Sequence, residues 1–330
     1  MKNFIMRMCM CGLFMSALIA LASCGGQAPA PGTGTGNNGP KVFVVGYSQS
    51  NNAEPYRAQL NLQLQHYIKQ YPDLKLLPIT DAHQDSTTQV SQVQSFISQH
   101  VDVLIVSPNE AAPLTAPVQQ ACAQHIAVII LDRTINSDCY TSFIGGDNVL
   151  IGRKAGEEAA ALLPNGGNVV ELRGILSNQP QIDRDQGFRQ GIASNPKIKI
   201  IADREAKWLK PNATTIMQEW LSQYPKIDLV YGENDPMALG AYLAASAVGK
   251  ASQIKFIGTD GLAIPDGGIR AVQQGQLAAT FVYPTGAKEA ADYAEKIVNK
   301  KAVEHKLILG TVAVTPENAA ALYNQYHLDS

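Results

Sequence analysis

The chain has 330 residues, with 26 Lys and Arg against 28 Asp and Glu, and 45% of its residues are apolar. Domains of roughly 100–200 residues are usual, so this length predicts two domains, and the apolar content excludes wholesale disorder. The formal charge is −2, with neither a block of like charge nor a basic stripe with interleaved aromatics. We therefore expect no nucleic-acid partner.

The first 24 residues are typical of an export signal. Lys2 and Arg7 precede an apolar, small-residue run over 8–22, which is shorter than the about 20 residues of a membrane-spanning helix. The run ends in Leu21-Ala22-Ser23-Cys24, which resembles the lipobox of bacterial lipoproteins, where the cysteine is lipidated and becomes the new N-terminus. The alternative is an ordinary secretory signal that is cleaved at a small residue. Residues 25–40 are Gly, Ala, Pro, Thr, Asn and Gln almost throughout and predict a flexible tether.

From residue 41 onward, strand-like apolar runs alternate with amphipathic helical stretches. The first series has predicted strands and helices at 41–47, 56–71, 75–79, 86–100, 103–107, 113–125, 128–131 and 140–144. The pattern restarts after residue 148, with a helix to 163 and strands at 168–172, 198–202, 229–231 and 255–258. Short runs of Val and Ile are typical of parallel strands that are covered on both faces. Two consecutive βαβ series predict an α/β protein with two doubly wound, Rossmann-like lobes.

Two of the five cysteines, Cys122 and Cys139, lie in this folded part. Cys122 is near the end of a predicted helix, and Cys139 directly precedes the predicted strand at 140–144. If this strand and the one before it are parallel neighbours, both cysteines lie at the same end of the sheet. Because cysteines of exported chains can pair, we predict a disulfide rather than two free thiols.

Polar side chains follow nearly every predicted strand, at the edge where doubly wound sheets bind ligands. They are Ser48, Gln49, Asp132, Arg133, Asp147, Asn148, Asn234, Asp235 and Asp260, the last of which is followed by Gly261. A carboxylate accepts hydrogen bonds from two vicinal hydroxyls, and an arginine fork donates to two oxygens. Nearby aromatics, namely Tyr47, Tyr56, Trp208, Tyr231 and Tyr283, offer rings on which an apolar sugar face packs. The pattern favours a sugar site.

Asn234 has a second interpretation, because Asn before Pro also marks the start of a helix. We expect Asp235 to cap the helix that begins at Pro236, which leaves Asn234 for the ligand. Asp132 with Arg133 has an alternative role as a structural ion pair, and Asp147 as a residue that positions the hinge.

Several short motifs carry a family resemblance through their order and spacing. They are Gly46-Tyr47-Ser48-Gln49 with Tyr56-Arg57, Leu131-Asp132-Arg133, Gly146-Asp147-Asn148, Ile182-Asp183-Arg184 with Gly187-Phe188, the run from Asn234 to Gly240, and Gly258-Thr259-Asp260-Gly261. The chain from about residue 41 to its end resembles the periplasmic sugar-binding proteins of ABC importers. Within them it is similar to the ribose and galactofuranose binding subfamily.

This resemblance implies the type I fold of periplasmic binding proteins, in which a sugar lies between two lobes. The hinge crosses three times, here near Gly146, near Tyr283 and near 309–311. The N-terminal lobe then spans 41–146 plus 284–310, and the C-terminal lobe spans 147–283 plus 311–330. Arg57, Asp132 and Arg133 act from the first lobe, whereas Arg184, Asn234 and Asp260 act from the second. The other implied ligand contacts are Trp208 as a stacking ring, Tyr283 where relatives often carry Gln, and Ser48, Tyr56 and Asp147.

The motifs of enzymes are missing from the sequence: it has no Gly-x-Ser-x-Gly elbow, no His-Glu-x-x-His pair and no P-loop lysine. We therefore expect a monomeric binding protein without catalytic activity, cofactor or metal ion. Its partners would be a pentose or hexose, furanose forms included, an ABC permease, and the membrane through lipidated Cys24. Its location would be the outer face of the cytoplasmic membrane or the periplasm. The main alternative is a sugar receptor that presents its closed form to a membrane kinase or chemoreceptor. A sugar-responsive repressor and a surface hydrolase are further alternatives.

Overall fold

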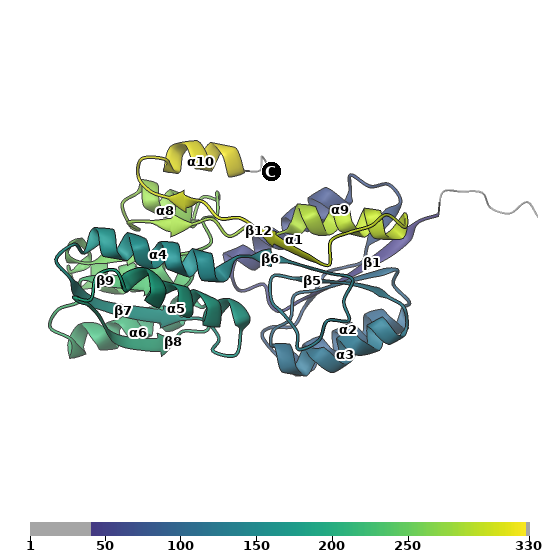
Figure 1. Ribbon diagram of the computed structural model, residues 1–330, viewed down its shortest axis with the longest axis horizontal. Coiled ribbons are helices and arrows are strands. Elements are labelled where there is room, and N and C mark those ends of the chain that lie inside the picture. Colours follow the sequence, from purple (N-terminus) through teal and green to yellow (C-terminus); the bar gives the residue numbers. More distant parts are fainter. Residues whose placement is uncertain (1–40, 328–330) are drawn as a thin grey trace, which may run out of the picture. The chain divides into compact units, whose positions relative to one another are not determined.

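The computed structural model describes residues 41–327 (Figure 1). The predicted signal over 1–24 with its lipidation site Cys24, the predicted tether over 25–40 and the last three residues of the chain lie outside this part. Within it, no helix has both the length and the apolar character that crossing a membrane requires.

The first of two parallel sheets has the strand order β12-β6-β5-β4-β1-β2, and β3 pairs with the end of β1. Its strands are β1 (Phe43–Gln49), β2 (Leu74–Leu76), β3 (Thr80–Asp81), β4 (Val103–Val106), β5 (Ala127–Leu131), β6 (Ser142–Gly146) and β12 (Lys306–Leu309). The Val-Leu-Ile-Val run of β4 is buried throughout, because helices cover both faces of the sheet. The strand expected over 75–79 is the shorter β2, and β3 is a separate strand that begins just beyond the expected range.

The second sheet has the order β10-β9-β7-β8 and is also parallel. Its strands are β7 (Gly167–Arg173), β8 (Ile198–Glu205), β9 (Leu229–Gly232) and β10 (Lys255–Ile257). Beside it, β11 (Thr280–Phe281) and β13 (Ala313–Val314) form a short antiparallel pair.

Helices pack on both faces of each sheet and bury its apolar side chains (Figure 1). The first sheet carries α1 (Pro55–Ile68) and α9 (Ala287–Val298) on one face, and α2 (Ser86–Ser98) and α3 (Ala111–Ala123) on the other. The second carries α4 (Asn148–Leu162) and α5 (Gln179–Ile192) on one face, and α6 (Lys210–Gln223) and α7 (Asp235–Ala247) on the other. The shorter helices are α8 (Gly268–Gln273), α10 (Ala319–Tyr326) and a 3-10 turn at Ala251–Gln253.

The close approach of α4 to α5 depends on glycine. A Cβ atom at Gly152 would lie 2.1 Å from the backbone oxygen of Arg184, so only glycine lets the two helices pack at this distance. This packing fixes the helical turn that carries Arg184 (α5) beside Asn148 at the start of α4.

The chain passes between the two sheets three times. It leaves β6 for α4 at residues 146–148, returns from β11 to α9 through 282–286, and leaves β12 for β13 through 310–312. The predicted architecture of two doubly wound lobes with a three-crossing hinge is thus confirmed. The residue bounds given above for the lobes stay a prediction.

The two folded-part cysteines lie where the sheet order brings them together. Cys122 is in the last turn of α3, and Cys139 precedes β6, which pairs in parallel with β5. The structure joins Cys122 and Cys139 in a disulfide.

Candidate functional site

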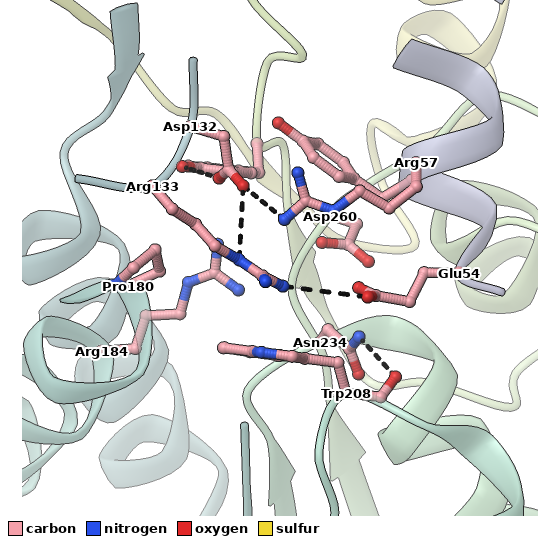
Figure 2. Close-up of a pocket in the computed structure, with 11 residues that line it drawn as sticks. Glu54, Arg57, Asp132, Arg133, Pro180, Arg184, Trp208, Asn234 and Asp260 are labelled. Carbon is pink, nitrogen blue, oxygen red and sulfur yellow. Dashed lines mark hydrogen bonds and ion pairs between the residues drawn. The ribbon is translucent and has the colours of Figure 1, made fainter. Parts of the chain in front are cut away.

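One cavity between the two lobes brings together nine of the eleven predicted ligand residues (Figure 2). Its lining consists of Glu54, Tyr56, Arg57, Asp132, Arg133, Pro180, Arg184, Trp208, Asn234, Asp260 and Tyr283. We call it the central cavity. Because almost all of these residues follow strands or begin helices, they meet at the carboxyl edge of both sheets, as doubly wound folds require.

On the N-terminal lobe, the charged groups of the cavity pair with one another. Arg57, in the first turn of α1, forms a hydrogen-bonded ion pair with Asp132, which follows β5. Arg133 lies with its Nε 3.8 Å from Asp132 Oδ2 and its Nη2 3.8 Å from Glu54 Oε1. All four side chains are at most 5% exposed. Two guanidinium groups thus balance two carboxylates within this half of the site.

These ion pairs determine the protonation states of Asp132 and Arg133. Burial alone would raise the pKa of Asp132, but the charges of Arg57 and Arg133 outweigh it and hold this pKa below its usual value. Burial and the neighbouring charge of Arg57 lower the pKa of Arg133 to about 10. Both groups remain charged near neutral pH. The backbone of Asp132 has a φ of 71°, a left-handed conformation that Asp adopts more readily than most residues.

On the C-terminal lobe, Arg184 is buried among neutral partners. Its Nε donates to Asn148 Oδ1 at 2.9 Å, and its Nη1 donates to the backbone oxygen of Glu233 at 2.6 Å. Its guanidinium carbon lies 4.6 Å from the ring centre of Tyr283 and 5.5 Å from that of Trp208. No carboxylate of residues 41–327 comes within 4.0 Å of it. This guanidinium keeps donor capacity toward the cavity.

Three buried carboxyl groups surround this half. Oδ2 of Asp260 has no hydrogen-bond partner in the described part of the chain. Asp235 accepts from the Gly261 backbone N–H at 2.8 Å and from the Thr280 hydroxyl at 2.6 Å. Glu233 accepts from the backbone N–H of residue 174 at 2.7 Å and from the amide of residue 181 at 3.2 Å.

Burial shifts all three carboxyl groups toward the neutral form. It raises the pKa of Glu233 to about 8 and that of Asp235 to about 6. For Asp260, burial and the neighbouring charge of Asp235 raise the pKa well above its usual value. Below about pH 6, the C-terminal half therefore holds protonated acids where the N-terminal half holds ion pairs.

Trp208 forms a fixed wall of the cavity. A Cβ atom at Gly174 would lie 2.0 Å from the indole, so the ring packs directly on that backbone. Its Nε1 donates to Asn178 Oδ1 at 3.1 Å, and Asn178 Nδ2 donates across the lobes to the Asn109 backbone oxygen at 2.7 Å. Asn234 Nδ2 donates to the Trp208 backbone oxygen at 3.1 Å (Figure 2).

Asn234 also corrects one prediction. Its Oδ1 accepts from the Met237 backbone N–H at 3.0 Å, so Asn234, and not Asp235, is the N-cap of α7. Asp235 lies in the first helical turn, and its carboxyl group is taken up by Gly261 and Thr280. Since Asn234 still lines the central cavity, capping and lining are both parts of its role.

Tyr283 connects the two halves at one of the crossings. Its hydroxyl donates to Asp132 Oδ1 at 2.6 Å, while the face of its ring meets Arg184. The ring of Tyr56 lies 5.3 Å from it, centre to centre, and the Tyr56 hydroxyl donates to the backbone oxygen of Pro284 at 3.3 Å.

Two predicted ligand residues do not line this cavity. Ser48 is fully buried, and its hydroxyl donates to Gln92 Oε1 on α2 at 3.4 Å. Asp147 is the N-cap of α4, where its Oδ1 accepts from the Leu150 backbone N–H at 2.9 Å. Both side chains are thus occupied in holding helices.

Two residues that line the cavity were not predicted from the sequence, Glu54 and Pro180. The sequence did contain a signal for Glu54. This acidic residue follows the first strand and directly precedes Pro55, which marks the start of a helix at the edge of the sheet where ligands bind. Pro180 lies in the first turn of α5, and its sequence context carries no signal of this kind.

The size of the cavity limits what it holds in this conformation. Its volume is about 20 Å³, little more than the roughly 10–15 Å³ that one water requires. A monosaccharide in this cavity therefore requires the lobes to lie further apart than in this conformation. Buried arginine forks, carboxyl groups and aromatic rings around so small a space suit a compact ring with several hydroxyl groups.

Comparison with known proteins agrees with this chemistry. A family model described as "Periplasmic binding protein domain" matches residues 45–302. The ribose import binding protein of Salmonella typhimurium is 33% identical over 241 residues, which cover 71% of this chain and 80% of that protein.

Solved structures give the same result. The fructose binding periplasmic domain of a hybrid two-component system is 36% identical with a TM-score of 0.82, over 86% of this chain and 94% of that one. An ABC transporter solute binding protein from Bacillus halodurans with bound myo-inositol is 31% identical with a TM-score of 0.81, over 88% of this chain and all of that one. The predicted resemblance is confirmed, and the chain belongs to the family of periplasmic binding proteins.

Proposed function

We propose that this protein is an extracytoplasmic solute-binding lipoprotein that captures a monosaccharide between its lobes and delivers it to an ABC importer. The observation that carries the proposal is the meeting of Arg184 and Asp260 of one lobe with the Arg57–Asp132–Arg133 group of the other around one small cavity. The names of relatives, a ribose import protein and a solute binding protein with bound myo-inositol, support a polyhydroxylated ligand and an importer as partner.

Capture follows from the division of the site between two lobes. A ligand shifts an equilibrium only by its differential affinity for the two states, and a sugar that touches both halves favours the closed one. Direct contacts also favour closure, namely Asn178 to Asn109 at 2.7 Å and the Ser177 hydroxyl to Glu110 at 2.7 Å. Several charge-assisted hydrogen bonds in a desolvated cleft give a Kd of about 1 μM or lower, near −8 kcal/mol.

The N-terminal segment completes the proposal. Lipidation of Cys24 would hold the protein at the outer face of the cytoplasmic membrane, since each buried CH₂ contributes about 0.8 kcal/mol. Residues 25–40 would act as the tether between the lipid and the sugar-binding unit. The test is metabolic labelling with a fatty acid analogue, in which a Cys24→Ser chain stays unlabelled.

The first experiment is a thermal shift of the chain from residue 41 on, the compact unit that carries its own hydrophobic cores. The panel holds pentoses, hexoses, their furanose-rich members and myo-inositol. A ligand at about 100 times its Kd stabilises the fold by about 2.7 kcal/mol. One sugar that raises the melting temperature supports the proposal, and a flat response to the whole panel contradicts it.

A pair of matched variants assigns the site. Arg184→Ala removes a buried guanidinium of the cavity, and we expect it to abolish the shift. Arg153→Ala removes a half-exposed guanidinium on α4, whose ion-pair partner within residues 41–327 is Glu157 at 3.6 Å, and serves as the control. Retained affinity in Arg184→Ala contradicts the site. We propose no catalysis and a monomeric state, so glycosides should remain unhydrolysed and light scattering should give the monomer mass.

A second function keeps the ligand and changes the partner. The similarity to a fructose binding domain of a hybrid two-component system favours a receptor that presents its closed form to a membrane kinase. Deletion of the gene distinguishes the two functions. Loss of uptake of the radiolabelled sugar supports transport, whereas intact uptake with lost transcriptional induction supports sensing.

A further inference from the structure

A second cavity adjoins the central one and shares three of its walls, Glu54, Trp208 and Asp260. We call it the vestibule. Its volume is about 180 Å³, against about 20 Å³ for the central cavity. The remaining lining consists of Ala53, Pro55, Leu209, Lys210, Pro211, Asp235, Pro236, Leu239, Leu262, Asp266, Gly267 and Gly268. A molecule in the central cavity therefore has room to extend past Trp208 into a larger space.

The vestibule belongs mainly to one lobe. Only the segment 53–55, directly before and at the start of α1, comes from the N-terminal lobe. The other walls come from the loop after β8, the first turns of α6 and α7, and the segment 260–268. Lobe opening thus leaves most of the vestibule intact, and closure brings 53–55 over it as a cover.

Carbon atoms dominate its walls. Three prolines and three leucines line it, and Leu239 and Leu262 are at most 8% exposed. Its exposed charges, Lys210 and Asp266, are surface side chains.

The buried polar groups of the vestibule are largely engaged elsewhere. Asp235 is held by Gly261 and Thr280 at 2.8 and 2.6 Å. Glu54 accepts from Asn51 Nδ2 at 2.8 Å and faces Arg133. Oδ2 of Asp260, at the border with the central cavity, has no hydrogen-bond partner within residues 41–327. Away from this border, a second sugar ring would bring its hydroxyl groups against apolar walls, whereas an apolar group would match them. A cavity of about 150 Å³ lined by apolar side chains holds a benzene molecule, so an aryl group fits this volume.

We propose, resting on the proposed function, that the ligand is a glycoside whose sugar ring occupies the central cavity and whose apolar, aryl-sized aglycone lies in the vestibule. Trp208 and Asp260 line both spaces and so flank the bond that joins the two parts. The rigid indole separates a polar compartment that selects the sugar from an apolar one that selects its substituent. Burial of the aglycone adds affinity in proportion to the apolar area removed from water.

The test compares methyl and phenyl glycosides of ribofuranose, galactofuranose and fructofuranose with the free sugars, by titration calorimetry. For the sugar that binds, we expect the phenyl glycoside to have a Kd at least about tenfold below that of the methyl glycoside. The reason is that each additional apolar carbon group that a ligand buries in a hydrophobic pocket strengthens binding. Ala53→Trp places a large ring in the vestibule from its exposed rim and should bring the ratio of the two Kd values to about one. Ala247→Trp, at an exposed position of α7 away from both cavities, is the matched control and should keep the ratio.

Each outcome is decisive. If free sugars bind while phenyl glycosides bind no better than methyl glycosides, this inference is wrong and the proposed function stands. A gain that persists in Ala53→Trp also overturns it, and Pro211→Trp, on the opposite exposed wall, repeats this test if Ala53→Trp does not fold. If a disaccharide binds more tightly than the phenyl glycoside, the vestibule holds a second sugar ring and the proposed aglycone is wrong. If neither sugars nor glycosides bind, both this inference and the proposed function fail.

Discussion

The two halves of the central cavity compensate their buried charged groups in opposite ways. In the N-terminal half, Asp132 lies between Arg57 and Arg133, and its pKa is lowered. In the C-terminal half, Arg184 bonds only to neutral atoms, and the pKa of Asp260 is raised well above its usual value. The first half pairs its charges without a ligand, although Nε and Nη1 of Arg57 lack a hydrogen-bond partner in the described structure. In the second half, Oδ2 of Asp260 lacks one within the same residues.

This difference separates stability from affinity. Removal of one member of a buried ion pair leaves the other charge uncompensated, so the N-terminal half should be sensitive to mutation even without ligand. A ligand hydroxyl that bonds to Asp260 Oδ2, and a ligand oxygen that accepts from Nε or Nη1 of Arg57, each satisfy a group that is otherwise buried alone, so both halves should gain from binding. We infer that the ion pairs of the N-terminal half contribute more to the stability of the ligand-free protein, whereas Asp260 contributes mainly to affinity.

The largest effect is expected from Asp132→Ala. This change leaves Arg57 buried without its partner and should lower the free energy of unfolding of the ligand-free protein by about 3–5 kcal/mol. Urea unfolding followed by circular dichroism measures it.

The counterpart in the other half is Asp260→Asn, because Asn also tolerates the left-handed backbone at this position, where φ is 132°. It should leave the unfolding free energy within about 1 kcal/mol of the parent protein and weaken sugar binding by about 10- to 100-fold. Equal losses of stability in the two variants would remove the distinction between the halves.

The next effect is a dependence of stability on pH. Glu233, with a pKa of about 8, and Asp235, with a pKa of about 6, hold protons in the folded state that they lose on unfolding. Stability from such raised pKa values is present at low pH and is lost as pH rises through them. The free energy of unfolding should therefore fall from pH 5 to pH 8, by about 1.4 kcal/mol per pH unit for each proton.

The N-terminal half acts in the opposite direction at lower pH. The lowered pKa of Asp132 contributes stability above about pH 4, and this stability is lost as pH falls further. Stability should thus be greatest at about pH 4, where the unfolded-state pKa values of these groups lie. Glu233→Gln should flatten the fall toward pH 8, and a ligand-free protein that is as stable at pH 8 as at pH 5 would contradict the protonated state.

The sequence was informative where parallel strands end. Asp132 with Arg133 follows β5, Asn234 follows β9 and Asp260 lies shortly after β10, and the sheet topology brings such positions to one edge whatever the order of the strands. Arg184 and Trp208 follow no such rule, and the family resemblance supplied them.

The sequence was uninformative where a contact depends on strand order or on a single residue of register. Arg57 meets Asp132 because β4 alone separates β1 from β5, and periodicity does not specify this order. Ser48, whose ligand role stays a prediction, lies outside the central cavity because β1 continues to Gln49, and alternation turns Ser48 toward α2 while Tyr47 faces the opposite side. Asp147 and Asn234 are N-caps, and their ligand roles stay predictions, because ligand contact and helix capping use the same side-chain oxygen.

Tyr283→Phe tests the residue that connects the two halves of the central cavity. It removes the hydroxyl that donates to Asp132 Oδ1 at 2.6 Å and keeps the ring that meets Arg184. A hydrogen bond to a charged group contributes about 1.5–3 kcal/mol. We expect a loss of this size in the unfolding free energy of the ligand-free protein, measured by urea unfolding. A loss below about 0.5 kcal/mol would show that Asp132 is already satisfied by its arginines.

Trp208→Phe gives the smallest effect and is the matched deletion in the other half. It removes the Nε1 donor that bonds Asn178 Oδ1 at 3.1 Å, a bond between neutral groups, so about 0.5–1.5 kcal/mol should be lost. Asn178 also donates to Asn109 across the lobes, so part of the loss should appear only in the closed state. Small-angle scattering with and without sugar measures this as a shift toward the open form. If Trp208→Phe destabilises the protein more than Tyr283→Phe, the neutral half contributes more to the fold than the charged one, and the division of roles is reversed.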